Sequence, residues 1–454
     1  MTSILSRAIF AHGIVGRADL PIPATYFGVA AAIVLVISFA SLAVGWTRPR
    51  LETVTERPLF RLPFAVEVVL GAVGVAVFAV AVYAGLAGTD IETENLAPTV
   101  IYVIFWVGVP VLSLVAGDVW RLLSPWRVVG RAVGALVQRA GGEDAAEPLP
   151  YPARLGRWPA FAGIVGFALV ELCWGRGTEP TMLAILALVY FAVQVVGMGL
   201  YGVEPWTRNG DAFGVYFGLF AALSPIGRRP DGTVVLRSPL SGAPHVARPP
   251  GTVALLCAGI GSTTFDGAKE GPLFGSIVPH LQDFFTGIGL SKGAALEWTF
   301  VVGLVVCIAL VAALYGLGVL GMGGDLAVGE RARAFVHTLI PIAAAYVVAH
   351  YFSLLAYQGQ AAWWLASDPL GDGSDWFGTA GGTIDYSVVS ATAIWYVQVA
   401  ALVIGHVSGL VLAHDRALAL YRSPRGATRS QIVMLVVMVA FTSLGLWLLS
   451  VSNS

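Results

Sequence analysis

The chain contains 454 residues, of which 57% are hydrophobic and only 12% are charged. A soluble globular domain usually has about 25% charged residues, so this composition excludes an ordinary soluble enzyme. The formal net charge of −1 does not by itself identify a partner. We expect the lipid bilayer as the surroundings and no nucleic acid. The three cysteines lack CxxC spacing, which argues against both a disulfide framework and a thiolate metal site.

Apolar runs long enough to cross about 30 Å of hydrocarbon recur along the whole chain. They predict an all-α polytopic membrane protein, folded as a single integral membrane domain over residues 1–454. We expect about ten transmembrane helices, and the sixth is the shortest of them. Their predicted ranges are 24–46, 63–87, 98–117, 157–175, 180–202, 250–264, 295–320, 330–356, 387–413 and 430–451.

Arginines concentrate in every second loop, after the first, third, fifth, seventh and ninth predicted spans. Positively charged loops stay in the cytoplasm, so both termini are predicted to face outward from a bacterial-type plasma membrane. Residues 1–23 then form an extracytoplasmic segment, and they lack the features of a cleavable signal peptide. The outer loops are predicted at 265–294 and 357–386.

Two similar segments follow spans that open with Pro-Thr, and both are predicted to lie on the cytoplasmic side. Each runs from Gly-Asp through apolar and aromatic residues to Leu-Ser-Pro and arginine, at 117–127 and 210–229. We interpret them as interfacial amphipathic helices whose N-termini are capped by Asp118 and Asp211. The second belongs to a cytoplasmic loop at 204–249, which also contains a β-favouring run at 233–236.

The sixth span is the least regular, because residues 250–264 are few and end in small polar side chains. One alternative is a half-helix that opens into an irregular loop, which membranes tolerate only where protein or a cavity satisfies the backbone. Asp266 then falls in the outer loop, where the sequence around it also suits a turn.

Two histidines are predicted at similar depth in the inner half of the membrane, His337 in the eighth span and His406 in the ninth. Ionisable groups inside a membrane are costly and usually mark functional sites. This pair could bind a metal ion or an axially ligated haem, or form a proton relay. The alternative is two neutral buried histidines bonded to a carbonyl or a hydroxyl group.

A second group is predicted on the outer side, where His350 lies about 20 Å along the helix from His337. Three further candidates could join it there if the fold brings them together: His12, Asp266 and His280. Imidazole and carboxylate are the ligand types of a divalent metal site, with Zn or Cu as the expected ion. Within this set, His350 and Asp266 are the expected catalytic residues.

Several stretches along the chain resemble the fenitrothion hydrolase family of multi-spanning bacterial membrane proteins. They lie at 11–23, 206–229, 262–267, 337–360 and 405–418. The resemblance implies an integral membrane hydrolase that acts on organophosphate triesters. It brings no established catalytic residues with it.

Three functions therefore stay open. The first is metal-assisted phosphotriester hydrolysis at the outer face, in which a metal would activate water. The second is a proton- or metal-coupled transporter. The third is a membrane subunit of a larger redox or metal-handling complex, which would add other membrane subunits as partners. The chain has no P-loop, GxSxG or CxxCH motif, which disfavours nucleotide-driven transport, serine hydrolase chemistry and covalent haem attachment.

Overall fold

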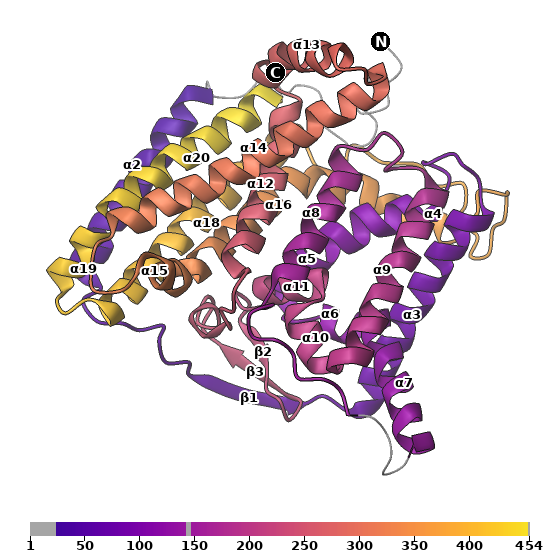
Figure 1. Ribbon diagram of the computed structural model, residues 1–454, viewed down its shortest axis with the longest axis horizontal. Helices are drawn as coiled ribbons and strands as arrows, with labels where there is room; N and C mark the ends of the chain where they lie inside the picture. The colour runs from indigo at the N-terminus through magenta and orange to yellow at the C-terminus, as the bar shows by residue number, and fades with distance from the viewer. Residues whose placement is uncertain (1–23, 142–146, 453–454) are drawn as a thin grey trace.

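The computed structural model describes residues 24–141 and 147–452, and the described chain is predominantly helical (Figure 1). Within these residues, seven segments are long and apolar enough to cross a membrane. An eighth would be the bent pair α19 (Pro424–Ser430) and α20 (Ile432–Ser452). Five of the seven are single helices: α2 (Ala24–Gly45), α3 (Phe64–Ala87), α9 (Pro180–Tyr201), α14 (Lys292–Gly321) and α18 (Ala391–Leu420). The sixth is a continuous run of α4 (Leu96–Pro98), η1 (Thr99–Gly108) and α5 (Val109–Ala116). The seventh is a run of α15 (Val328–Phe335), η4 (Val336–Thr338), α16 (Leu339–Tyr357), η5 (Gln358–Gln360) and α17 (Ala361–Leu365).

The other helices are shorter or more buried, and the count of ten spans stays a prediction. Two of them fall on predicted spans: α8 (Trp158–Leu172) and α12 (Thr252–Lys269). The rest are α6 (Trp120–Leu123), α7 (Pro125–Gly141), α10 (Val203–Asn209), α11 (Ala212–Ala221), η3 (Ala243–His245) and α13 (Pro272–Gly287). Together they fill the interior and cover the two ends of the helix array.

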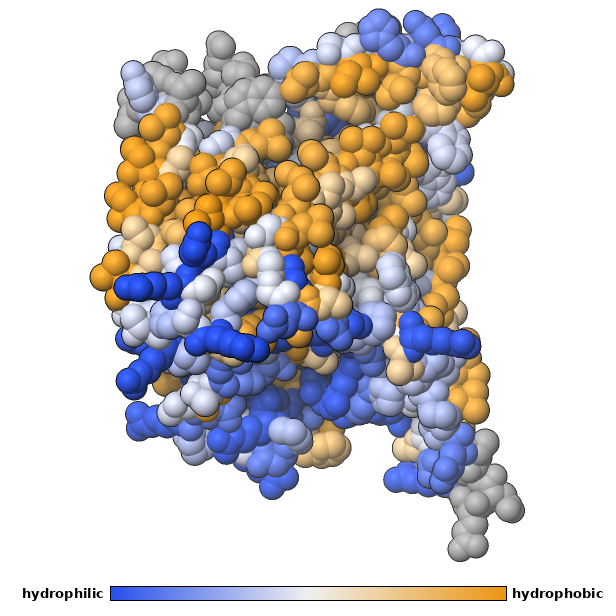
Figure 2. Space-filling model, turned by 60° about the vertical axis from the view of Figure 1, so that its left-hand side comes forward, coloured by the Kyte–Doolittle hydropathy of each residue, from blue (hydrophilic) through white to orange (hydrophobic). Residues whose placement is uncertain are grey.

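The lateral surface is apolar. Figure 2 shows a broad belt of hydrophobic side chains, with polar side chains gathered below it. Helix α3 has one face on the lateral surface and one in the protein interior. Val69, Val73 and Val77 are exposed, whereas Gly71 and Ala81 are buried. Small residues let membrane helices approach closely while branched apolar residues face lipid, so this surface is suited to a bilayer.

A three-stranded antiparallel sheet closes the polar end of the molecule (Figure 1). Its strand order is β1 (Glu56–Arg61), β3 (Thr233–Arg237), β2 (Ile226–Arg228). The predicted run at 233–236 is thus confirmed as a strand, and it pairs on both sides. Helices α6, α10, α15 and α19 lie at this same end, so the arginine-rich loops gather there, whereas α13 lies across the opposite end.

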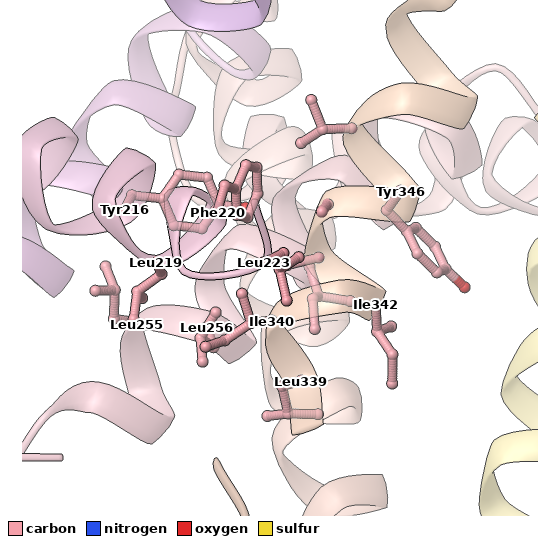
Figure 3. Packing of buried hydrophobic residues seen from close by; sticks show 14 of the residues in the cluster. Tyr216, Leu219, Phe220, Leu223, Leu255, Leu256, Leu339, Ile340, Ile342 and Tyr346 are labelled. Carbon is pink, nitrogen blue, oxygen red and sulfur yellow. The ribbon is translucent and has the colours of Figure 1, made fainter. Parts of the chain in front are cut away.

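The centre of the core lies where α11, α12 and α16 meet. In Figure 3, Ile340 of α16 points toward Leu256 of α12, whereas Ile342 and Tyr346 point to the other side of α16. Helix α16 is therefore apolar and buried around most of its circumference, as expected for a helix inside a large helical array. This position places His350, in the C-terminal half of α16, in protein surroundings.

Two sequence predictions for this region are wrong. Helix α12 does not open into a loop: it continues to Lys269, and the hydroxyls of Thr263 and Thr264 donate back to the carbonyls of Gly259 and Ile260. Helix α11 is not interfacial, because most of its side chains are buried. Its sequence is apolar on every side, so burial rather than an interface satisfies it.

Candidate functional site

Asp266 lies in the last turn and a half of α12 and is only 1% exposed. Glycines bring this helix deep into the core. A Cβ on Gly261 would lie 2.6 Å from the Cα of Ile308 on α14, and one on Gly259 would lie 2.4 Å from the hydroxyl of Tyr216 on α11. The close packing that glycine permits carries a carboxylate into an apolar interior, where it needs polar partners.

Three side chains surround this carboxylate, and with it they form what we call the outer polar cluster: Asp266, Lys269, His350 and Tyr351. The ammonium of Lys269 lies 2.9 Å from Oδ1 of Asp266, one helical turn away. From α16, Nε2 of His350 lies 2.8 Å from Oδ2, and the hydroxyl of Tyr351 donates to the same oxygen at 2.9 Å. Consecutive residues of one helix thus approach a single carboxylate.

Further acidic groups surround the cluster. Glu171 on α8 and Glu270 directly after α12 are close enough to interact electrostatically with Asp266 and Lys269. The side chain of Lys269 is 9% exposed and that of His350 is 17% exposed. His350 is therefore the most exposed member of the outer polar cluster.

The predicted outer metal site is not assembled from its described members. Among the described residues, no group of three or more His, Cys, Asp or Glu side chains could hold a metal ion. His280 is exposed on α13, away from the buried carboxylate, and His12 lies outside the described residues. Both oxygens of Asp266 already face donors, one of them an ammonium, which repels a second cation.

The two inner histidines are buried in different surroundings. His406 lies near the middle of α18, closer to the centre of the membrane span than predicted, because α18 continues to Leu420. Its ring lies 6.1 Å from that of Tyr346, whereas His337 lies in η4, well before Tyr346 along the chain. His337 is fully buried, with the backbone of Ala334 beside its ring.

A cavity of about 40 Å³ adjoins His406 and is lined by residues of α12, α14, α16, α18 and α20. His337 is not one of its lining residues, and the cavity is far too small for a haem. Nδ1 of His406 lies 2.8 Å from the carbonyl oxygen of Leu402, and Nε2 has no hydrogen-bond partner in the described part of the chain. The contact with Leu402 is the kind expected for the alternative interpretation of His406, a neutral buried histidine bonded to a carbonyl group.

The C-terminal part of α18 contains a polar contact that the sequence did not suggest. His414 is 1% exposed, and its Nε2 lies 3.0 Å from the carbonyl oxygen of Trp46. The neighbouring Asp415 accepts hydrogen bonds from the indole of Trp46 and from the backbone amides of Arg50 and Leu51. These bonds attach the loop after α2 to α18, so they serve packing rather than chemistry.

Both predicted N-cap residues contact backbone amides at the start of a helix. Asp118 accepts from the backbone amide of Arg121 at the start of α6, as expected. Asp211 is the N-cap residue of α11, where its carboxylate interacts with the backbone amides of Phe213 and Gly214; it also accepts from the indole of Trp126 at 2.7 Å and from the hydroxyl of Tyr190 at 2.9 Å. The two similar segments therefore contact each other directly, through Trp126 of the first and Asp211 of the second.

Sequence reasoning missed some of the residues at these sites. Lys269 could have been found from its i, i+3 spacing to Asp266, which puts both on one helix face. Met434 and Met438, which line the cavity beside His406, are one helical turn apart in the last span. Their spacing is visible in the sequence, but buried methionine is usually only packing.

Comparison with known proteins finds no family model, no curated protein and no solved structure that matches this chain.

Proposed function

We propose that the protein is a proton-coupled membrane transporter in which the outer polar cluster binds and releases the coupling proton. The observation that supports this proposal is the buried carboxylate of Asp266, held at once by Lys269, His350 and Tyr351. Ionisable groups kept inside a membrane protein commonly serve as ion and proton sites. The proposal includes the plasma membrane of a bacterium, ten spans and a cytoplasmic location for the arginine-rich end.

The bonding of Asp266 suits a proton switch between helices. A proton on this carboxylate would weaken its ion pair with Lys269 and turn one oxygen from an acceptor into a donor. The second change acts between helices, since Asp266 belongs to α12 whereas His350 and Tyr351 belong to α16; the ion pair with Lys269 lies within α12 itself. Glu171 on α8 and Glu270 after α12 set the surrounding charge and would feel the same proton.

The test uses wild-type protein in proteoliposomes adsorbed on a solid-supported membrane. We expect a rapid change of external pH to produce a transient current from proton binding, and we expect Asp266→Asn and His350→Gln to abolish it. Under a proton gradient, a panel of inorganic and organic ions then identifies the solute that gives a sustained current. Asp283→Asn, an exposed aspartate on α13, is the matched control and should behave as wild type.

The proposal fails if the pH step gives wild-type and empty liposomes the same current, or if both cluster variants keep the wild-type current. Folding is checked by gel filtration, because Asp266→Asn leaves Lys269 without its charge partner. His350→Gln retains a hydrogen-bonding side chain, so it tests the cluster without that complication.

Phosphotriester hydrolysis, which the resemblance implies, stays a prediction with less geometric support. Metal-assisted hydrolysis needs ligands with free lone pairs and an open coordination position. Asp266 instead faces an ammonium, an imidazole and a phenol.

A further inference from the structure

The cavity beside His406 combines an imidazole with two thioethers. His406 comes from α18, and Met434 and Met438 come from successive turns of α20. His406 is fully buried, and Met434 and Met438 are 7% and 6% exposed. The cavity therefore lies among buried side chains of the helix array without being fully closed, and none of its lining residues belongs to the outer polar cluster.

The hydrogen bonding of His406 leaves one nitrogen available. A carbonyl oxygen only accepts, so the 2.8 Å contact with Leu402 requires Nδ1 of His406 to carry the hydrogen. In the neutral ring, Nε2 then holds a free lone pair, and it has no partner among the described residues. A second ring nitrogen bonded to a backbone carbonyl is the usual arrangement of a histidine that binds a metal ion.

Space for the thioethers is provided by the facing helix. A Cβ on Gly318 of α14 would lie 2.6 Å from Sδ of Met434, so this thioether packs directly against the glycine. The whole chain contains six methionines, and two of them line this one cavity.

The surroundings favour a soft cation of low charge. Thioether ligands favour Cu(I), whereas Zn(II) prefers thiolate, imidazole and carboxylate ligands, so the two methionines rather than the imidazole make the selection. A single positive charge also costs less to bury than a double one. Phe441 lines the cavity, and its ring stacks on Tyr346 and lies 6.3 Å from His406, so aromatic faces are present to interact with a cation.

We infer that His406, Met434 and Met438 form a binding site for a soft monovalent metal ion of the Cu(I) class. This inference does not rest on the proposed proton coupling, because the ligands lie apart from Asp266 and binding can be measured without transport. It also differs from the predicted pair of His337 and His406, since the additional ligands are methionines.

The test titrates the purified full-length protein in detergent with Cu(I) in the presence of a chromogenic Cu(I) chelator. We expect one equivalent to bind to wild type, and we expect Met434→Leu and Met438→Leu each to weaken binding at least about tenfold, a loss typical of an impaired metal site. Leucine preserves volume, so these variants should fold. X-ray absorption of the bound copper should show sulfur neighbours in wild type and fewer in each variant.

Met198→Leu is the matched control, because this methionine is equally buried but lies on α9, away from the cavity. It should bind Cu(I) as wild type does. The inference is overturned if wild type takes up no Cu(I) against the chelator, if the double variant Met434→Leu/Met438→Leu binds as tightly as wild type, or if Zn(II) binds this site as well as Cu(I) does. Thermal unfolding of each variant verifies that it is folded, and none of these outcomes bears on the proton current assigned to Asp266.

Discussion

Three buried aspartates in this protein are held by several donors, but the donors differ in kind. Asp211 and Asp415 accept hydrogen bonds from indoles, a phenol and backbone amides, none of which titrates near neutral pH. Asp266 instead faces an ammonium on Lys269 and an imidazole on His350, which are both basic groups. The identity of the donors, more than burial, is what distinguishes a carboxylate suited to proton transfer from one that holds the fold together.

Glu204 on α10 provides a pH-dependent contribution to stability at the polar end. Burial acts to raise the pKa of this carboxyl, but Arg127, Arg121 and Arg131 outweigh that effect and lower the pKa to about 2. A lowered pKa in the folded state stabilises the fold above the ordinary value of 4.5, and this stabilisation is lost as pH falls from there toward about 2.

We therefore expect Glu204→Gln to melt at a lower temperature than wild type at neutral pH, and the difference to shrink progressively below the ordinary carboxyl pKa. Thermal unfolding in detergent across this pH range measures it. Glu179→Gln, which removes an exposed i, i+3 pair with Arg176, should change melting little at any pH. A difference for Glu204→Gln that stays constant down to acid pH would contradict the assignment.

At the scale of elements, α3 packs through small residues at several contacts. A Cβ on Gly74 would lie 1.7 Å from the carbonyl oxygen of Leu123, at the end of α6, and one on Gly85 would lie 2.6 Å from the carbonyl oxygen of Pro180, at the start of α9. Backbone atoms cannot move aside as a flexible side chain can. The helix spacing here thus depends on the absence of side chains.

Gly74→Ala should therefore destabilise the protein by about 1–3 kcal/mol, the usual range for overpacking, and thermal or chemical unfolding in detergent would measure the loss. Gly199→Ala on α9 is the matched control, because nothing lies within 4 Å of a Cβ there. It should be neutral or slightly stabilising, since alanine favours helix more than glycine does. Equal effects of the two substitutions would show that the contact with Leu123 is not tight.

The long lipid-facing helices could be predicted from sequence because their length and apolar character are local properties. Other elements could not, because their state depends on distant partners. Strand β1 pairs with β3, which belongs to another loop, and the sequence around residues 56–61 does not indicate that pairing. For the site, the sequence analysis placed Asp266 and His350 in one group but did not include Lys269, whose position beside Asp266 depends on α12 continuing to residue 269.

For the whole molecule, the arginine-rich loops at one end predict which end faces the cytoplasm. Positive residues are retained on the cytoplasmic side, so the end with the sheet and α19 should face the cytoplasm and α13 should face outward. We expect Asp283→Cys on α13 to react with a membrane-impermeant maleimide in intact cells. Asp325→Cys, between α14 and α15, should react only after the cells are permeabilised.

Both aspartates are exposed, so the two substitutions differ in side rather than in burial. The native cysteines provide the background: Cys173 and Cys257 are buried, and Cys307 is partly buried in α14. Labelling of Asp325→Cys from outside, with protection of Asp283→Cys, would reverse the proposed orientation.

Helices α2 and α20 lie side by side although they stand at opposite ends of the described chain (Figure 1). Asp415 of α18 also accepts hydrogen bonds from Trp46 and from the backbone that follows α2. During translation, α2 leaves the ribosome long before either partner exists. Until then, the face of α2 that contacts these helices must be exposed to lipid. The packing of α2 against α18 and α20 is therefore among the last steps of assembly.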